Sequence, residues 1–139
     1  MRLFLMVIAF SCYLQAQTHE LYDWKVSRVL DGDTVEVVVD FLPKELGNRL
    51  LVRIWGVDTP EKGWQAKTDK EREMGVSATE FTKQLVKDAK IIKINIISWD
   101  KFGGRVLGDL VIDGKSLRSL LLSNGYAREY YGEKKQNWD

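Results

Sequence analysis

The chain has 139 residues, a length that fits one compact domain rather than two. Its residues are 45% hydrophobic and 29% charged, which is the balance of a globular protein and excludes a disordered chain. The formal net charge of +1 excludes the strong overall field of many nucleic-acid binders, so any site for an anion has to be local.

Residues 1–16 have the pattern of a secretory signal peptide. One arginine is followed by an apolar run that ends at Leu14, too short to span a bilayer comfortably, and then by polar residues. We expect cleavage after Ala16 and a secreted or periplasmic protein with one domain, residues 17–139. Two alternatives stay open: a lipid anchor on Cys12, and an N-terminal strand or helix buried in the domain.

Cysteine and histidine are almost absent from the sequence. The only cysteine is Cys12 and the only histidine is His19. Without the signal peptide the chain has no thiol, which excludes disulfides and thiol catalysis. One histidine also argues against a Cys/His zinc site and a serine–histidine triad. Outside the cytoplasm calcium is available, and calcium prefers oxygen ligands.

A β-hairpin is predicted at the start of the domain. Two β-branched segments, 24–30 and 34–40, flank the pair Asp31-Gly32, which is typical of a two-residue turn. Every second residue after Asp33 belongs to the face that should be buried: Val35, Val37 and Val39. The hairpin therefore carries a carboxylate on the core side, which a plain turn does not require.

The rest of the chain predicts three more strands and two helices. The strands are expected at 50–58, 91–99 and 105–112. Apolar residues at spacings of three and four predict a helix from about Lys70 to Lys90. A short helix should follow Ser116 as N-cap and end before Gly125.

This order of elements predicts a mainly β fold with helices, of the α+β class. A five-stranded barrel of the OB type with two packed helices is its commonest form, and a sandwich or open sheet stays possible on the pattern alone. The polar tail, residues 133–139, is expected to fray.

Four charged residues stand out from this pattern: Asp33, Arg53, Asp58 and Arg105. Each alone has a structural explanation, such as a turn, a cap or an arginine at a strand edge. If the second and third strands are neighbours, however, Asp33 and Asp58 can converge, and two close carboxylates favour a cation such as calcium between them. Two arginines beside a metal indicate a phosphate. Glu61 is placed to act on a water, which completes a set for phosphodiester hydrolysis.

Several segments, in order, resemble the staphylococcal nuclease (thermonuclease) family. They are VLDGDTVEV, VRIWGVDTPE, the helix ATEFTKQLVKDAK, DKFGGRVLGDLVIDGKSL and LLSNGYA, within residues 25–131. The resemblance implies an OB-type barrel that binds calcium through Asp33, Asp58 and the carbonyl of Thr59. It also implies that Glu61 acts on the attacking water and that Arg53 and Arg105 stabilise the phosphate.

The family further implies which residues hold the substrate: Lys101, Phe102, Tyr130 and Tyr131. Stacking of bases on aromatic rings tolerates any sequence. The resulting hypothesis is a monomeric, calcium-dependent nuclease that cleaves DNA and RNA with little sequence preference and needs no protein partner. The alternatives are an OB-fold module that binds nucleic acid or protein without catalysis, and an exported structural protein whose charges only cap strands.

The chain departs from the family pattern in three places. Gly103 and Gly104 stand where the family commonly has one glycine, so the turn either absorbs the extra residue as a bulge or re-aims Arg105. The loop 40–49 is expanded, and we expect the C-terminal helix of longer members to be missing after Tyr131.

Overall fold

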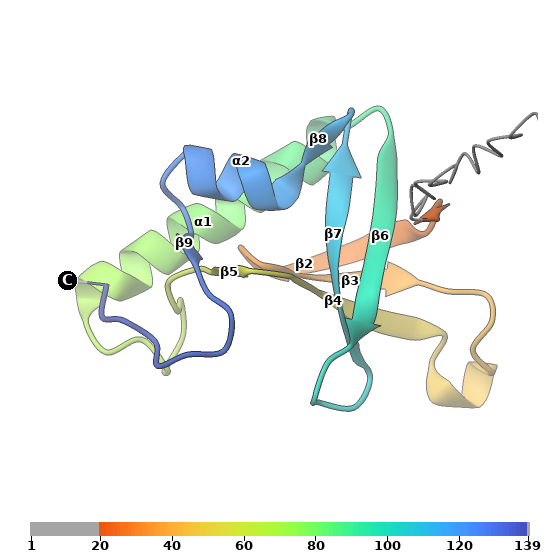
Figure 1. Ribbon diagram of the computed structural model, residues 1–139, viewed down its shortest axis with the longest axis horizontal. Helices are drawn as coiled ribbons and strands as arrows, with labels where there is room; N and C mark the ends of the chain where they lie inside the picture. The colour runs from red at the N-terminus through yellow and green to blue at the C-terminus, as the bar shows by residue number, and fades with distance from the viewer. Residues whose placement is uncertain (1–19, 139) are drawn as a thin grey trace, which may run out of the picture.

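The computed structural model describes residues 20–138, a β-sheet with two helices (Figure 1). The predicted signal peptide and the alternative lipid anchor on Cys12 lie outside these residues and stay predictions. His19 lies outside them as well. Within residues 20–138, no helix is both long and apolar enough to cross a membrane.

Two sheets make up the β-structure. The larger, seven-stranded sheet has the order β1-β6-β7-β4-β3-β2, with β8 paired to β7, and the smaller one pairs β5 with β9. All of these pairs are antiparallel except β4 with β7, which is parallel. The strand bounds are Leu21–Tyr22 (β1), Lys25–Asp31 (β2), Thr34–Val38 (β3), Arg49–Ile54 (β4), Val57–Asp58 (β5), Ile92–Trp99 (β6), Arg105–Ile112 (β7), Lys115–Ser116 (β8) and Arg128–Glu129 (β9).

The core lies on the face that the alternation of the strands predicts. Val35 and Val37 of β3 are fully buried, and β7 alternates between partly buried and buried residues along its whole length. Strand side chains alternate between the two faces, so this pattern buries one face. The largest fully buried hydrophobic side chains are Ile54, Ile94, Leu110, Leu117 and Leu121.

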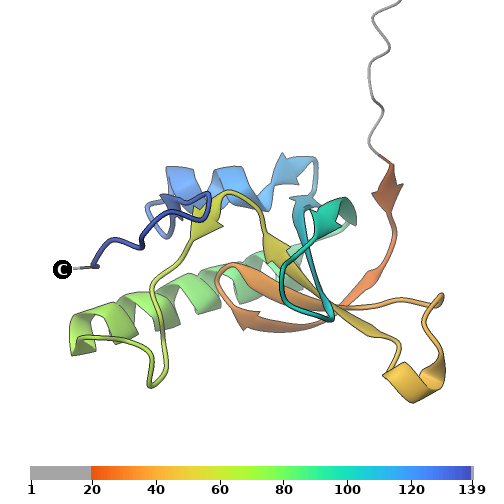
Figure 2. The same ribbon diagram turned by 60° about the horizontal axis from the view of Figure 1, so that its bottom comes forward.

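Both helices begin at a side-chain cap. Helix α1, Asp69–Asp88, starts after Thr68, whose hydroxyl accepts a hydrogen bond from the Glu71 amide at 3.0 Å. Helix α2, Leu117–Ser123, starts after Ser116, which caps it in the same way. A capping oxygen satisfies an N–H group that has no partner inside the helix. The 3-10 helix η1, Lys44–Leu46, lies in the 40–48 loop, far from the start of α1 in Figures 1 and 2.

The predicted α+β class with two helices is confirmed, and the five long strands occur where they were expected. Two details differ. The third predicted strand is broken into β4 and β5 at Gly56, whose φ of 75° does not suit an extended strand. The hairpin turn consists of Gly32 and Asp33 rather than Asp31 and Gly32, because Asp31 pairs with Thr34 at the end of the ladder.

The structure is consistent with the predicted OB-type fold, although the strand pairings of the described residues do not close the sheet into a complete barrel. Among residues 20–138, the chain of strand pairings runs from β1 to β2 and does not close on itself. The side of β2 meets α1 instead: the Thr82 hydroxyl of α1 donates to the Gly32 carbonyl oxygen at 2.7 Å, at the turn that follows β2. The helix thus packs against the first hairpin.

The expectation that the C-terminal tail frays is wrong. Residues 132–138, which we call the C-terminal strap, fold back on the domain, and Trp138 is only 6% exposed. The Arg128 guanidinium lies 3.9 Å from the centre of the Trp138 ring, and Lys67 donates to the Asn137 side chain at 2.8 Å. A buried aromatic ring with a cation on its face anchors a polar segment that composition alone suggests is loose.

Candidate active site

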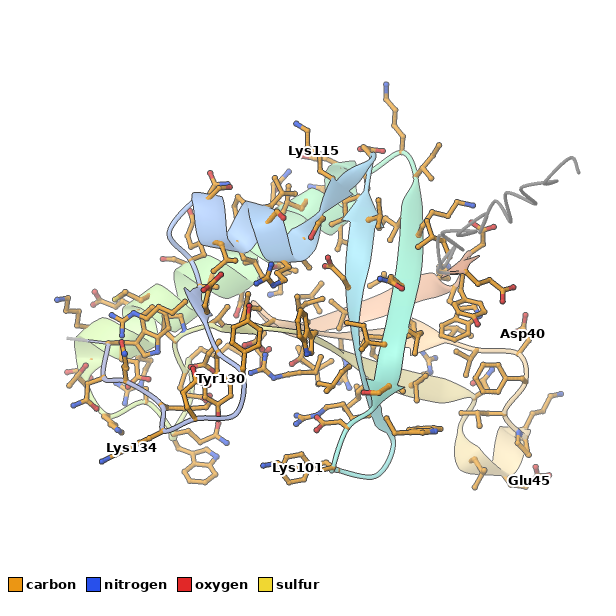
Figure 3. The ribbon with its side chains drawn as sticks, in the orientation of Figure 1. Asp40, Glu45, Lys101, Lys115, Tyr130 and Lys134 are labelled. Carbon is orange, nitrogen blue, oxygen red and sulfur yellow. The ribbon has the colours of Figure 1, made fainter. Side chains whose placement is uncertain are left out.

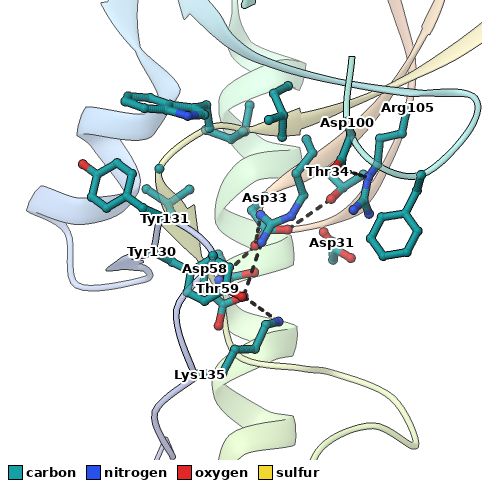
Figure 4. Close-up of a pocket in the computed structure, with 18 of the residues that line it drawn as sticks. Asp31, Asp33, Thr34, Asp58, Thr59, Asp100, Arg105, Tyr130, Tyr131 and Lys135 are labelled. Atoms are coloured by element: carbon teal, nitrogen blue, oxygen red, sulfur yellow. Dashed lines mark hydrogen bonds and ion pairs between the residues drawn. The ribbon is translucent and has the colours of Figure 1, made fainter. Parts of the chain in front are cut away.

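A cavity of about 730 Å³ brings the predicted site residues together (Figure 4). Ten of them were named from the sequence, and all ten line this cavity: Asp33, Arg53, Asp58, Thr59, Glu61, Lys101, Phe102, Arg105, Tyr130 and Tyr131. They come from the β2–β3 turn, from β4 and β5, from the β6–β7 hairpin and from the segment after β9. Figure 3 shows Lys101 at the tip of that hairpin. Their chemical roles stay predictions.

Two buried carboxylates form the centre of the site. Asp33 is 5% exposed in the β2–β3 turn, and Asp58 is 6% exposed in β5. The Thr59 amide donates to Asp33 Oδ2 at 2.9 Å, and the Thr34 hydroxyl donates to Asp33 Oδ1 at 3.1 Å. The hydrogen bond from the Thr59 amide joins the turn to the chain directly after Asp58, so the two acids converge as predicted.

Arg53 bridges these two acids from β4. Its Nη1 lies 2.6 Å from Asp33 Oδ2, and its Nη2 lies 3.4 Å from Asp58 Oδ1. The ladder sets this position, because Arg53 pairs with Thr34, the residue after Asp33. Among the described residues, the buried Nη1 has no acceptor in hydrogen-bond geometry. Nη1 nevertheless lies at ion-pair distance from Asp33, so both terminal nitrogens of Arg53 already face carboxylates.

Arg105 begins β7 and lies in the cavity wall. Its Nε donates to Asp100 Oδ2 at 2.5 Å, and its guanidinium lies 4.8 Å from the centre of the Phe102 ring. Gly104 has a φ of 74°, a conformation that favours glycine. The glycine pair therefore turns the chain within the hairpin and leaves Arg105 facing the cavity.

Helix α1 supports the loop that carries Glu61. The Glu61 amide donates to the buried Glu71 carboxylate at 3.4 Å, and the Lys67 amide donates to the same carboxylate at 2.8 Å. A Cβ on Gly75 would lie 2.6 Å from the Glu61 carbonyl oxygen, closer than real atoms approach. The supporting roles of Glu71 and Gly75 were not predicted from the sequence. The two residues lie one turn apart on the helix face that also presents Ala78, a pattern typical of close packing.

Lys135 enters the cavity from the strap. Its Nζ lies 2.8 Å from Asp58 Oδ1 and 3.4 Å from Glu61 Oε1 (Figure 4). Partial burial lowers the pKa of Lys135, but the contacts with Asp58 and Glu61 outweigh it, and the pKa is raised overall. No local pattern pointed to Lys135, because its position depends on a tail that was expected to fray.

Asp31 adds a third carboxylate beside Asp33. Burial, followed by repulsion from Asp33, raises the pKa of Asp31 from 3.8 to about 7. Its Oδ1 is buried and has no hydrogen-bond partner in the described part of the chain. Buried polar atoms in proteins normally form a hydrogen bond, and this oxygen is an exception.

The donor chemistry fits a hard divalent cation. Asp31, Asp33 and Asp58 offer only oxygen, and one of these oxygens lacks a partner. As folded, however, Arg53 and Lys135 already contact the acids, and within residues 20–138 no group of three His, Cys, Asp or Glu side chains is arranged as a metal centre. A cation therefore has to compete with the two basic side chains.

The pH dependence of stability should reveal Asp31. A carboxyl pKa raised by folding means that the folded state binds the proton more tightly, so stability falls as pH rises from about 4 to about 7 and then levels off. We expect Asp31→Asn to remove roughly 2–4 kcal/mol of this fall in denaturant unfolding without metal. Asp40→Asn, an exposed loop position labelled in Figure 3, should leave it unchanged. Equal pH profiles for wild type and Asp31→Asn would contradict the assignment.

This chain belongs to the staphylococcal nuclease family. The family model for staphylococcal nuclease homologues matches residues 51–139, which include most of the site. The chain is 32% identical over 114 residues to the SPbeta prophage-derived endonuclease YokF of Bacillus subtilis, covering 81% of this chain and 36% of that protein. It is 31% identical over 114 residues to the endonuclease YncB of Bacillus subtilis, covering 81% and 50%.

A further similar protein is an uncharacterized endonuclease of Escherichia coli, 29% identical over 107 residues, which cover 76% of this chain and 60% of that protein. The chain thus spans between about a third and three fifths of the length of these relatives. The comparisons agree with the family resemblance of the sequence segments, and the family-model match covers most of the residues that line the cavity.

Proposed function

We propose that this protein is a nuclease that hydrolyses phosphodiester bonds of DNA and RNA with little sequence preference. The observation that carries the proposal is the convergence of two arginines, two buried aspartates and Glu61 on one cavity. Membership of the nuclease family and the endonuclease names of its relatives support it.

In the proposed reaction the two arginines bind the scissile phosphate. Arg53 lines the cavity beside the two aspartates, and Arg105 faces the cavity from β7. Guanidinium groups keep their charge at any relevant pH and pair with phosphate oxygens in a fixed geometry. They would stabilise the charge that develops on the phosphate as the bond breaks.

Glu61 is the proposed general base. Its carboxylate lies at the edge of the cavity next to Asp58, since Lys135 contacts both, and it would take the proton of the attacking water. Asp33, Asp58 and the Thr59 carbonyl would hold calcium, with Asp31 beside them. When bound, calcium would polarise the phosphate and orient the water.

The aromatic residues of the cavity favour an unpaired nucleic-acid strand as substrate. Phe102 and Tyr131 are each 55% exposed, and Lys101 lies 5.3 Å from the centre of the Phe102 ring. Exposed aromatic rings beside cations stack on bases without reading their sequence. Tyr130 also lines the cavity and would contribute to the same surface.

We further propose that the protein acts outside the cytoplasm, in secreted or periplasmic form, as a monomer. The signal-like pattern of residues 1–16 supports export, and residues 17–139 would form the active domain. An oxygen-ligand calcium site suits that compartment.

Incubation of the full chain with plasmid DNA and with RNA tests the function. We expect cleavage of both in calcium, and none when a chelator removes it, because the acids would lose the ion that orients the water. Equal cleavage in excess chelator would refute the calcium mechanism. Binding of nucleic acid without cleavage under all metal conditions would favour the non-catalytic binding module.

A further inference from the structure

The C-terminal strap is held at both ends against the cavity. Before the strap, the Tyr130 amide donates to the Gly56 carbonyl oxygen at 3.0 Å, and β9 pairs with β5, the strand of Asp58. At its end, Trp138 is buried under the Arg128 guanidinium. Fixed ends restrict the path of the residues between them, so Lys135 is positioned by the fold.

Lys135 is the one strap residue whose side chain contacts the site acids among residues 20–138. It reaches Asp58 Oδ1 at 2.8 Å and Glu61 Oε1 at 3.4 Å, and its side chain is 46% exposed. Arg53 also approaches Asp58, but it is 14% exposed and comes from the middle of the sheet. Of the two cations, Lys135 is therefore the one that can move away without disturbing a strand.

We propose that Lys135 is a tethered cation that neutralises Asp58 and Glu61 and that calcium has to displace, so that the strap lowers the affinity of the site for metal. This inference rests on the proposed function, because it takes Asp58 as a calcium ligand. It adds a regulatory role for the strap, which the proposed catalytic set does not contain.

Two physical effects make the competition strong. The ammonium group occupies the oxygen that a metal would use, and it repels a divalent ion at short range. Its tether also gives it a high effective concentration, on the millimolar scale for short flexible connections, so it rebinds each time the metal leaves. Calcium in an extracellular compartment is abundant enough to overcome such a competitor.

Calcium titration of the full chain by isothermal calorimetry tests the proposal without using activity. We expect Lys135→Gln to bind calcium about tenfold more tightly than wild type, since one competing charge is removed. Lys134→Gln is the matched control: it removes the same charge from the neighbouring strap residue (Figure 3), which forms no ion pair with the site acids in the described chain, and should change affinity less than twofold. Trp138→Ala, which frees the end of the strap, should shift affinity in the same direction as Lys135→Gln.

The outcomes separate this inference from the proposed function. Tighter binding by Lys135→Gln but not by Lys134→Gln supports it. Equal, measurable affinity in wild type and Lys135→Gln overturns it and leaves the calcium site intact. An equal gain in both lysine variants also overturns it, because only net charge would then matter. Failure of every variant to bind calcium overturns it together with the metal part of the proposed function.

Discussion

Replacing Glu61 by glutamine is expected to lower kcat for nucleic-acid cleavage by about 10²–10⁴-fold, the usual contribution of a positioned general base. Glutamine keeps the size and hydrogen-bonding shape of the side chain but cannot accept the proton of the attacking water. The backbone amide of residue 61 donates a hydrogen bond to the Glu71 carboxylate, and this contact does not depend on the side chain that is replaced. Steady-state cleavage at substrate concentrations well above KM measures the loss.

The matched control for this variant is Glu73→Gln, an exposed glutamate on α1 outside the cavity wall. Both variants should keep the wild-type melting temperature within about 2 °C, since surface substitutions change stability by less than about 0.5 kcal/mol. Only Glu61→Gln should lose activity. Full activity of Glu61→Gln would assign the base to another group.

Gly75→Ala is expected to lower cleavage by about 100-fold, although it changes a residue that touches no substrate. The new Cβ would lie 2.6 Å from both the carbonyl carbon and the carbonyl oxygen of Glu61, so the loop has to shift and Glu61 moves with it. Alanine favours a helix over glycine by about 1 kcal/mol, which offsets part of the clash. The variant should therefore fold, and its kcat should fall more than its affinity for substrate.

Ser77→Ala is the control for Gly75→Ala, because it also lies in α1 but is exposed. Its activity should match wild type. Wild-type kcat in Gly75→Ala would show that the loop does not set the position of Glu61. Loss of folding would be visible as loss of cooperative thermal unfolding, which distinguishes a folding defect from a displaced Glu61.

Local patterns predicted most of the fold. The alternation in β3, the spacing of apolar residues in α1 and the capping residue Ser116 all depend on near neighbours in the chain. These signals placed the five long strands and both helices close to their observed bounds. They did not show how completely the sheet closes, since that depends on pairings between strands far apart in the chain, such as β1 with β6.

The sequence predicted those site residues that lie in single strands or turns with a local pattern of their own. Asp33, Arg53 and Arg105 each break a local pattern, and the family resemblance supplied their proposed roles. Lys135 and Glu71 were missed for a physical reason. Lys135 reaches the cavity only because Trp138 anchors the strap, and Glu71 matters only through its contact with a loop ten residues before it. Neither contact has a local sequence signal.

The parallel pairing of β4 with β7 determines when in folding the two arginines come together. Strands β2, β3 and β4 pair through local antiparallel turns, and so do β6 and β7. The two units join through the parallel pairing of β4 with β7 and through β1, two residues before β2, which pairs with β6. Closing the long loop between the two units, which contains α1, is entropically costly, and such pairings form slowly. Arg53 lies on one side of the parallel pairing and Arg105 on the other, with Arg105 paired to Leu51. A chain emerging from the ribosome therefore acquires all its site carboxylates before it can form the arginine pair, and that pair exists only in a molecule whose two halves have docked.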